Sequence, residues 1–201
     1  MYFPKISRRV NYKRARHGGY YSGYHEYFEE IAEDCQRRCV YCDVILEEIG
    51  GEGMHLDHFR PQKSFPELNN SPLNLVLACA KCNQLKSDWF PEQNEIDTGQ
   101  ACGFVDHFEV DRLEYFNVDE LGRVVGLRPP ANYMIELLCL NRDSRRAIRR
   151  VRAVKRLAFD VMAQIEAELL NFSRDLEQVT PEKLNVLAGA LGDIRKMLHE
   201  M

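Results

Sequence analysis

Apolar residues change their spacing along the chain, and this change predicts a fold that mixes helices with short strands. Residues 25–38 carry apolar side chains at helical spacing. Residues 54–59, "MHLDHF", are short and fit a strand, and residues 60–72 are rich in loop formers. Residues 73–90 open with an apolar run and continue into a helix after their cysteines. Strand and helix are therefore expected close together in this part of the chain.

The second half of the chain predicts a hairpin followed by helices. Residues 107–129 alternate enough for two strands, with a turn near 119–122, because the glycine there supplies the backbone freedom that a turn needs. From about residue 132 to the end the spacing is helical. Thr180 at the N-cap and Pro181 at the first position begin the last helix.

Charged residues are unevenly distributed, although the net charge of −4 is small. Residues 1–25 hold six bases and no acid, residues 92–120 hold nine acids and one base, and residues 142–156 hold eight bases and one acid. Two basic segments therefore surround an acidic one, and the average charge does not indicate nucleic-acid binding. With 201 residues, of which 45% are apolar, one globular domain with extensions is expected.

No membrane span or signal peptide is apparent in the sequence. The chain has no run of about 18 apolar residues, and its first residues, "MYFPKISRRV", lack the apolar stretch of a signal peptide. We therefore expect a cytoplasmic protein that makes no membrane contact. In a reducing compartment the seven cysteines favour metal binding or free thiols over disulfides.

Four of the cysteines form two C-x-x-C pairs, Cys39 with Cys42 (the first cysteine pair) and Cys79 with Cys82 (the second cysteine pair). Two such pairs can supply four thiolates to one tetrahedral ion, which predicts a structural Zn²⁺ site. The 36 residues between the pairs (43–78) exceed the spacing of a simple zinc ribbon, so this insert must fold on the frame. Two unrelated pairs of buried thiols, or a redox pair, are the alternatives.

The insert contains "MHLDHFRPQ", residues 54–62, which crowds ionisable groups among apolar ones. Together with "CVYC", "NLVLAC" and "CNQLK" in this order, it resembles the HNH endonuclease family, in which a ββα-metal finger is braced by a zinc-binding four-cysteine frame. The resemblance covers residues 39 to about 91, a quarter of the chain. It implies metal-dependent cleavage of nucleic-acid phosphodiester bonds, with double-stranded DNA as the expected substrate.

The resemblance implies a role for each matching position. Asp57 matches the acidic ligand of the catalytic ion, and His58 matches the histidine that acts as general base. Asn74 matches the central asparagine that steadies the active-site loop. Asn83 stands at the third motif position, where many members carry histidine, so the chain is an HNN variant with asparagine as an ion ligand. Lys86 matches a lysine that lies near the phosphate backbone.

The chemistry of these residue types agrees with the resemblance. The carboxylate of Asp57 and the carbonyl of Asn83 are oxygen donors that suit a hard divalent ion, Mg²⁺ or Mn²⁺. Histidine can take a proton from water near neutral pH, the role expected of His58. Strand alternation would place Asp57 and His58 on opposite faces, so both reach one site only if the strand ends or bulges there. Arg60, which follows, is either a phosphate ligand or an exposed arginine.

Basic residues 142–156 place arginines on one helical face, because positions 142, 145, 149, 152 and 156 recur at three- and four-residue steps. Arg145, Arg149 and Arg152 in this row are expected to contact phosphate groups of the nucleic acid. The alternative is a face neutralised by the acids of residues 92–120 or by a partner protein.

These features predict an α+β fold: a ββα-metal HNH finger on a four-cysteine zinc frame, an acidic β-hairpin and a helical C-terminal part. We expect four regions along the chain. They are a basic arm and helix (1–38), the zinc-braced HNH nuclease core (39–91), the acidic hairpin (92–130) and a helical C-terminal region with the basic helix (131–201).

Other functions fit parts of the same sequence. A zinc-finger module that binds nucleic acid without cleaving it would keep the cysteines but would not need Asp57, His58 and Asn83 together. A zinc deaminase would carry H-x-E and P-C-x-x-C, but this chain has Asp57 and Ala78 instead of that glutamate and that proline. The chain also resembles HNH proteins of bacterial defence systems that act beside an ATPase, which makes a nuclease effector with a protein partner the third alternative.

Overall fold

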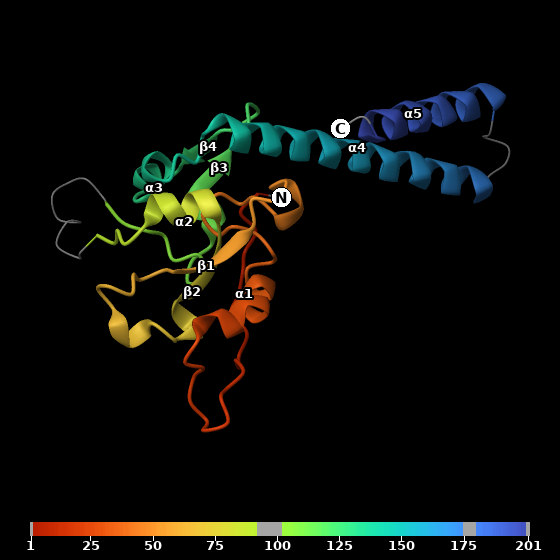
Figure 1. Ribbon diagram of the computed structural model, residues 1–201. Coiled ribbons are helices and arrows are strands. Elements are labelled where there is room, and N and C mark those ends of the chain that lie inside the picture. The colour runs from red at the N-terminus through yellow and green to blue at the C-terminus, as the bar shows by residue number, and fades with distance from the viewer. Residues whose placement is uncertain (1, 92–101, 175–179, 200–201) are drawn as a thin grey trace. The chain divides into compact units, whose positions relative to one another are not determined.

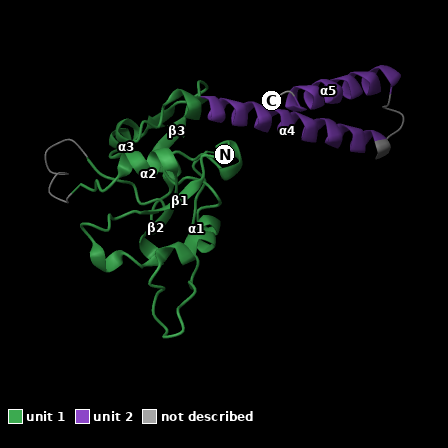
Figure 2. Cartoon of the chain, in the orientation of Figure 1, with its two compact units in different colours: residues 1–146 green, residues 147–201 purple. Residues whose placement is uncertain are grey.

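A computed structural model describes residues 2–91, 102–174 and 180–199. The chain divides into two compact units, residues 1–146 and 147–201 (Figure 2). Residues 92–101, the first part of the predicted acidic hairpin region, lie outside the described residues. The described part mixes helices with small antiparallel sheets, so the predicted α+β class is confirmed.

The first unit is built around a two-stranded antiparallel sheet followed directly by a helix (Figure 1). Strand β1 (Met54–His58) pairs with β2 (Leu75–Cys79), with Met54 opposite Cys79 and His58 opposite Leu75. Helix α2 (Ala80–Lys86) begins at the residue after β2. Every residue of β2 is buried, because β1 pairs with this strand and α1 and α2 contact it. The predicted ββα finger is therefore present.

Helix α1 (Phe28–Asp34) follows the 3-10 turn η1 (Tyr24–Tyr27) and contacts both strands of this sheet. Tyr27 at the end of η1 and Ile31 and Ala32 of α1 are buried, as the helical spacing predicted. The helix ends earlier than predicted, because Gln36 and Arg37 take positive φ angles that a right-handed helix does not allow. Further 3-10 turns occupy Leu46–Glu48, Pro66–Leu68, Pro72–Asn74 and Arg112–Glu114.

A second sheet is the hairpin of β3 (Phe116–Val118) and β4 (Val124–Gly126). Its turn lies where the sequence predicted it: the Asp119 carboxylate accepts hydrogen bonds from two turn amides, and Gly122 takes a φ of 74°. Helix α3 (Ala131–Leu137) packs on β4.

The second unit contains helix α5 (Pro181–His199) and all but the first turn of helix α4 (Asp143–Arg174). The Thr180 hydroxyl accepts a hydrogen bond from the Lys183 amide at 3.3 Å, so the predicted cap of α5 is confirmed. Large apolar side chains of α4 such as Leu157 and Phe159 are exposed. No described helix has both the length and the apolar character that a membrane crossing requires.

The N-terminal segment packs into the core of the first unit through Phe3 and Ile6, which are buried. Arg112 holds it there: this guanidinium is fully buried and donates to the Pro4 carbonyl at 2.7 Å and the Val40 carbonyl at 3.1 Å. It also lies 3.6 Å from the buried carboxylate of Asp43. One charged side chain therefore links the N-terminal segment, the first cysteine pair and the hairpin region.

Replacing Arg112 with Ala should lower the free energy of unfolding by about 3–5 kcal/mol, because it leaves the buried Asp43 carboxylate and two carbonyls with fewer donors. Chemical denaturation measures the change. Arg123→Ala is the matched control, since Arg123 pairs with Asp119 on the surface and its loss should cost about 1 kcal/mol or less. Equal effects of the two substitutions would contradict this assignment.

Candidate active site and metal centre

All four cysteines of the two pairs converge on one buried point. Their sulfur atoms lie within 4.8 Å of one another, and Cys42 and Cys79 are 3.7 Å apart. A tetrahedral zinc with Zn–S bonds of about 2.3 Å separates its sulfurs by about 3.8 Å, so this donor set fits a structural zinc. The predicted four-cysteine cluster is confirmed. Cys79 and Cys82, the two cysteines that resemble the deaminase C-x-x-C, belong to this four-cysteine cluster.

The backbone fixes the first cysteine pair against the sheet. The Val40 amide donates to the Leu77 carbonyl of β2 at 2.9 Å, and the Asp43 amide donates to the Cys39 carbonyl at 2.9 Å. The second cysteine pair spans the junction between β2 and α2, with Cys79 as the last strand residue. The two pairs therefore meet where the finger changes from strand to helix.

Two arginines surround the thiols. The Arg142 Nη2 atom lies 3.6–3.9 Å from the sulfurs of Cys42, Cys79 and Cys82, and the Arg145 Nη2 atom lies 3.4 Å from that of Cys79. The neighbouring thiols, Cys39 first, and the Arg145 guanidinium lower the pKa of Cys79. These cations favour the thiolate form, which is the form that binds zinc.

The predicted phosphate-binding row on α4 has a different environment from the one expected. Arg145 is 3% exposed, and its guanidinium donates to the Glu52 carboxylate at 2.7 Å as well as to Cys79. It cannot reach a phosphate without leaving both partners. Arg149 is also buried and Arg152 is half-buried, and their phosphate contacts stay a prediction.

Two side chains hold the Asp57 carboxylate, one from within the first cysteine pair and one from helix α2, which begins within the second. Tyr41, inside the first pair, donates its hydroxyl to Oδ2 at 2.6 Å, and the Lys86 ammonium at the end of α2 lies 3.3–3.4 Å from both oxygens. Burial raises the pKa of Asp57, while the Lys86 charge and the Tyr41 hydroxyl act in the opposite direction. The four-cysteine frame therefore positions this carboxylate directly.

Lys86 does not lie at the surface, as a contact with the phosphate backbone would require. It is fully buried and donates to the His58 carbonyl at 2.7 Å as well as to Asp57. Burial lowers the pKa of Lys86 against the raising effect of Asp57. Its ammonium therefore serves the interior of the site, and its contact with the phosphate backbone stays a prediction.

His58 is the last residue of β1 and has a defined hydrogen-bond environment. Its Nε2 atom lies 2.7 Å from the Asn69 carbonyl and 3.2 Å from the Gln62 amide nitrogen. The Asn69 carbonyl can only accept, so this contact is a hydrogen bond when Nε2 is the protonated ring nitrogen. The Tyr24 ring meets the imidazole edge-on at 4.6 Å.

Asn74 fixes the chain directly after His58. Its side-chain oxygen accepts from the Arg60 amide and its side-chain nitrogen donates to the Arg60 carbonyl, both at 2.9 Å. This two-way bond holds the turn where β1 ends. Arg60 itself is exposed.

Asp57, His58 and Asn83 line one open cleft of about 190 Å³, together with Ser87 and Asp88. The end of β1 at His58 allows Asp57 and His58 to reach the same space despite strand alternation. The carboxylates of Asp57 and Asp88, with the carbonyl of Asn83, give this cleft the oxygen donors that a hard divalent ion prefers. His55 instead lines a neighbouring hollow that also borders Asn83.

Sequence reasoning missed four residues of this site: Tyr24, Tyr41, Asn69 and Asp88. Asp88 lies in the turn after α2, two residues beyond Lys86, and its short distance from the motif is the signal in the sequence that could have identified it. Tyr41 stands between two ligand cysteines, where only the cysteine spacing carries a recognisable pattern.

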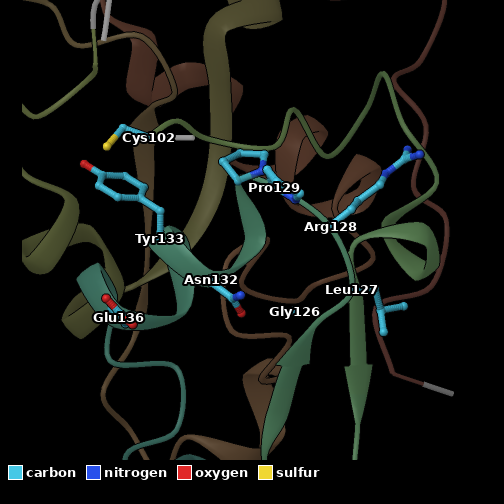
Figure 3. Close-up of a pocket in the computed structure, with 9 residues that line it drawn as sticks. Cys102, Gly126, Leu127, Arg128, Pro129, Asn132, Tyr133 and Glu136 are labelled. Carbon is cyan, nitrogen blue, oxygen red and sulfur yellow. The ribbon is translucent and has the colours of Figure 1, made fainter. Parts of the chain in front are cut away.

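A larger hollow of about 400 Å³ lies between β4 and α3 (Figure 3). Its described lining includes Arg128, Tyr133, Glu136 and Cys102, but it has no pair of carboxylates and no histidine. Of these two hollows, the cleft beside His58 is the one that combines carboxylates with a histidine.

Comparisons with known proteins agree with this location. The sequence model described as HNH endonuclease matches residues 39–88. The chain is also 34% identical over 56 residues to the Septu protein PtuB of Bacillus thuringiensis. That match covers 28% of this chain and 21% of the relative, so it spans about a fifth of that protein. The predicted HNH endonuclease domain is confirmed at residues 39–88.

Cys79→Ser should remove most of the bound zinc and lower the thermal stability of the domain, because binding of a structural metal contributes directly to folding. Metal analysis of the purified wild-type chain should find about one zinc per chain. Cys102→Ser, outside the cluster, is the matched control and should keep full zinc. A Cys79→Ser protein with unchanged zinc and stability would rule out the four-thiolate site.

Proposed function

From the HNH endonuclease domain at residues 39–88, we propose that this chain is a metal-dependent endonuclease that hydrolyses phosphodiester bonds of double-stranded DNA. The observation that carries the proposal is the single cleft shared by Asp57, His58 and Asn83. It combines oxygen donors for a divalent ion with a histidine that can accept a proton.

Asp57 and Asn83 would hold Mg²⁺ or Mn²⁺, and Asp88 offers a further oxygen in the same cleft. When bound, such an ion polarises the phosphate and stabilises the charge that develops during cleavage. Lys86 and Tyr41 keep Asp57 in one orientation, and their donation offsets the effect of burial on its charge.

His58 acts as the general base in this proposal. Donation from Nε2 to the Asn69 carbonyl fixes the ring and leaves Nδ1 to take a proton from the attacking water. Tyr24 packs against the ring, and Asn74 holds the backbone that follows it. These contacts limit rotation of the imidazole, which favours proton transfer at one fixed position.

A zinc-finger module that binds nucleic acid without cleaving it is the alternative at the level of activity. The positioning of Asp57 by two buried donors favours the nuclease, because a binding module has no need of an oriented, buried carboxylate.

We also propose that the chain acts with an ATPase as its protein partner, on the basis of the resemblance to HNH proteins of bacterial defence systems. Co-purification of the chain with such an ATPase tests this part.

His58→Ala should lower the rate of plasmid cleavage in Mg²⁺ or Mn²⁺ by about 10²–10⁴-fold, because loss of a general base typically costs that much. Zinc content and thermal stability should stay unchanged. His55→Ala is the matched control, since His55 lies three residues away and outside the catalytic cleft. Normal cleavage by the His58→Ala protein would refute the catalytic assignment.

Tyr41→Phe should weaken activation by the divalent ion about tenfold at neutral pH, since a hydrogen bond to a charged group contributes about 1.5–3 kcal/mol. The Tyr41 hydroxyl lowers the pKa of Asp57, so its removal raises that pKa. Protonation of Asp57 then competes with ion binding up to a higher pH. The acid limb of the plot of activity against pH should therefore move to higher pH.

The measurement is the ion concentration for half-maximal cleavage at several pH values. Tyr115→Phe, which has no contact with Asp57 among the described hydrogen bonds, is the control. A Tyr41→Phe profile that coincides with wild type would show that this hydroxyl does not orient the ion ligand.

A further inference from the structure

Residues 13–23, here called the basic-aromatic loop, have a defined shape. The Tyr27 hydroxyl closes the base of the loop by donating to the Lys13 carbonyl at 3.2 Å and accepting from the Tyr21 amide at 3.0 Å. At the tip, the Gly18 amide donates to the Ala15 carbonyl at 2.8 Å. Gly18 takes a φ of 82°, which favours glycine.

The cations of this loop have no acidic partners. Lys13, Arg14, Arg16 and His17 are exposed, and within the described residues no carboxylate lies at ion-pair distance from Lys13, Arg14 or Arg16. The Arg14 guanidinium donates to the Gly18 carbonyl at 2.9 Å and lies over the Tyr20 ring at 5.4 Å.

Two other arginines of the N-terminal segment behave differently. Arg8 donates to the carbonyls of Pro72 and Leu75, and Arg9 bonds Glu30 and Asp34. These two stabilise the fold. The cations of the basic-aromatic loop therefore differ from their neighbours in being available to an external anion.

The loop leads directly into the proposed catalytic cleft. Tyr24, the first residue after the loop, lines this cleft and packs edge-on against His58 at 4.6 Å. A long polyanion with one phosphate beside His58 can therefore place its neighbouring phosphates near the loop.

We propose that the basic-aromatic loop binds the sugar–phosphate backbone of the nucleic-acid substrate beside the phosphate that is cleaved. Unpaired cations attract phosphates, and the interleaved Tyr20, which is 37% exposed, offers an aromatic face to a sugar or base. Glu26 is the exposed acid nearest in sequence, and one carboxylate does not balance three cations. This inference rests on the proposed nuclease function.

The test uses the full chain with His58→Ala, so that the substrate stays intact, and a short fluorescent DNA duplex. Binding is measured as a function of salt from about 50 to 200 mM. Adding Lys13→Ala, Arg14→Ala and Arg16→Ala should weaken binding on the order of tenfold. The salt slope, which is the slope of log K against log salt concentration, should become smaller in magnitude by up to about 2.7, or about 0.9 for each lost phosphate contact. Arg16→Ala alone should reduce the slope by about 0.9.

Lys13→Arg with Arg14→Lys and Arg16→Lys is the matched control, because it keeps all three charges and should keep the slope. In the catalytically competent chain the triple alanine variant should raise KM and leave kcat unchanged. If the triple alanine variant keeps the affinity and the salt slope of its parent, the loop proposal alone is overturned. The three cations of the wild-type loop would then serve an acidic protein partner. A parent His58→Ala chain that binds no duplex would overturn the nuclease proposal with it.

Discussion

The Asp57 carboxylate is the group on which the proposed catalytic site depends. It is 6% exposed, and removing an ionised carboxylate from water costs several kcal/mol unless donors compensate. Tyr41 and Lys86 supply those donors, one from inside the first cysteine pair and one from the helix that follows the second. Movement of either pair would therefore displace a donor from Asp57. The four-cysteine frame thus fixes the orientation of the residue that we propose as an ion ligand, and its two donors favour the charged form against the effect of burial.

Buried arginines extend the same principle through the first unit. Arg112 holds the N-terminal segment and the first cysteine pair together, while Arg145 joins the start of α4 to Glu52 and Cys79. In each case a cation meets carbonyls, carboxylates or thiols that would be costly to bury alone. These links connect residues far apart in sequence, so they join the four-cysteine frame to the N-terminal segment and to the start of α4.

Local sequence patterns were sufficient to predict the finger, the thiolate cluster and the hairpin. The cysteine spacing specifies a tetrahedral donor set, and a glycine at position 122 specifies a turn. The same patterns could not give the orientation of Lys86 or Arg145. A row of arginines at helical spacing looks the same whether it faces solvent or the interior. For Arg145 the choice depends on partners 66 and 93 positions away in the sequence.

The distribution of cations also bears on how a chain of net charge −4 could bind a polyanion. At physiological salt, charges act over about 8 Å, so cations near the cleft matter more than the net charge. Lys86 and Arg145 are used internally, whereas Arg60 and Lys63, which follow His58 in the chain, and the cations of the basic-aromatic loop are exposed. Contacts of this kind reach phosphates, and phosphate contacts position a duplex without identifying its bases. Binding through phosphate contacts alone would therefore confer little preference for one base sequence over another.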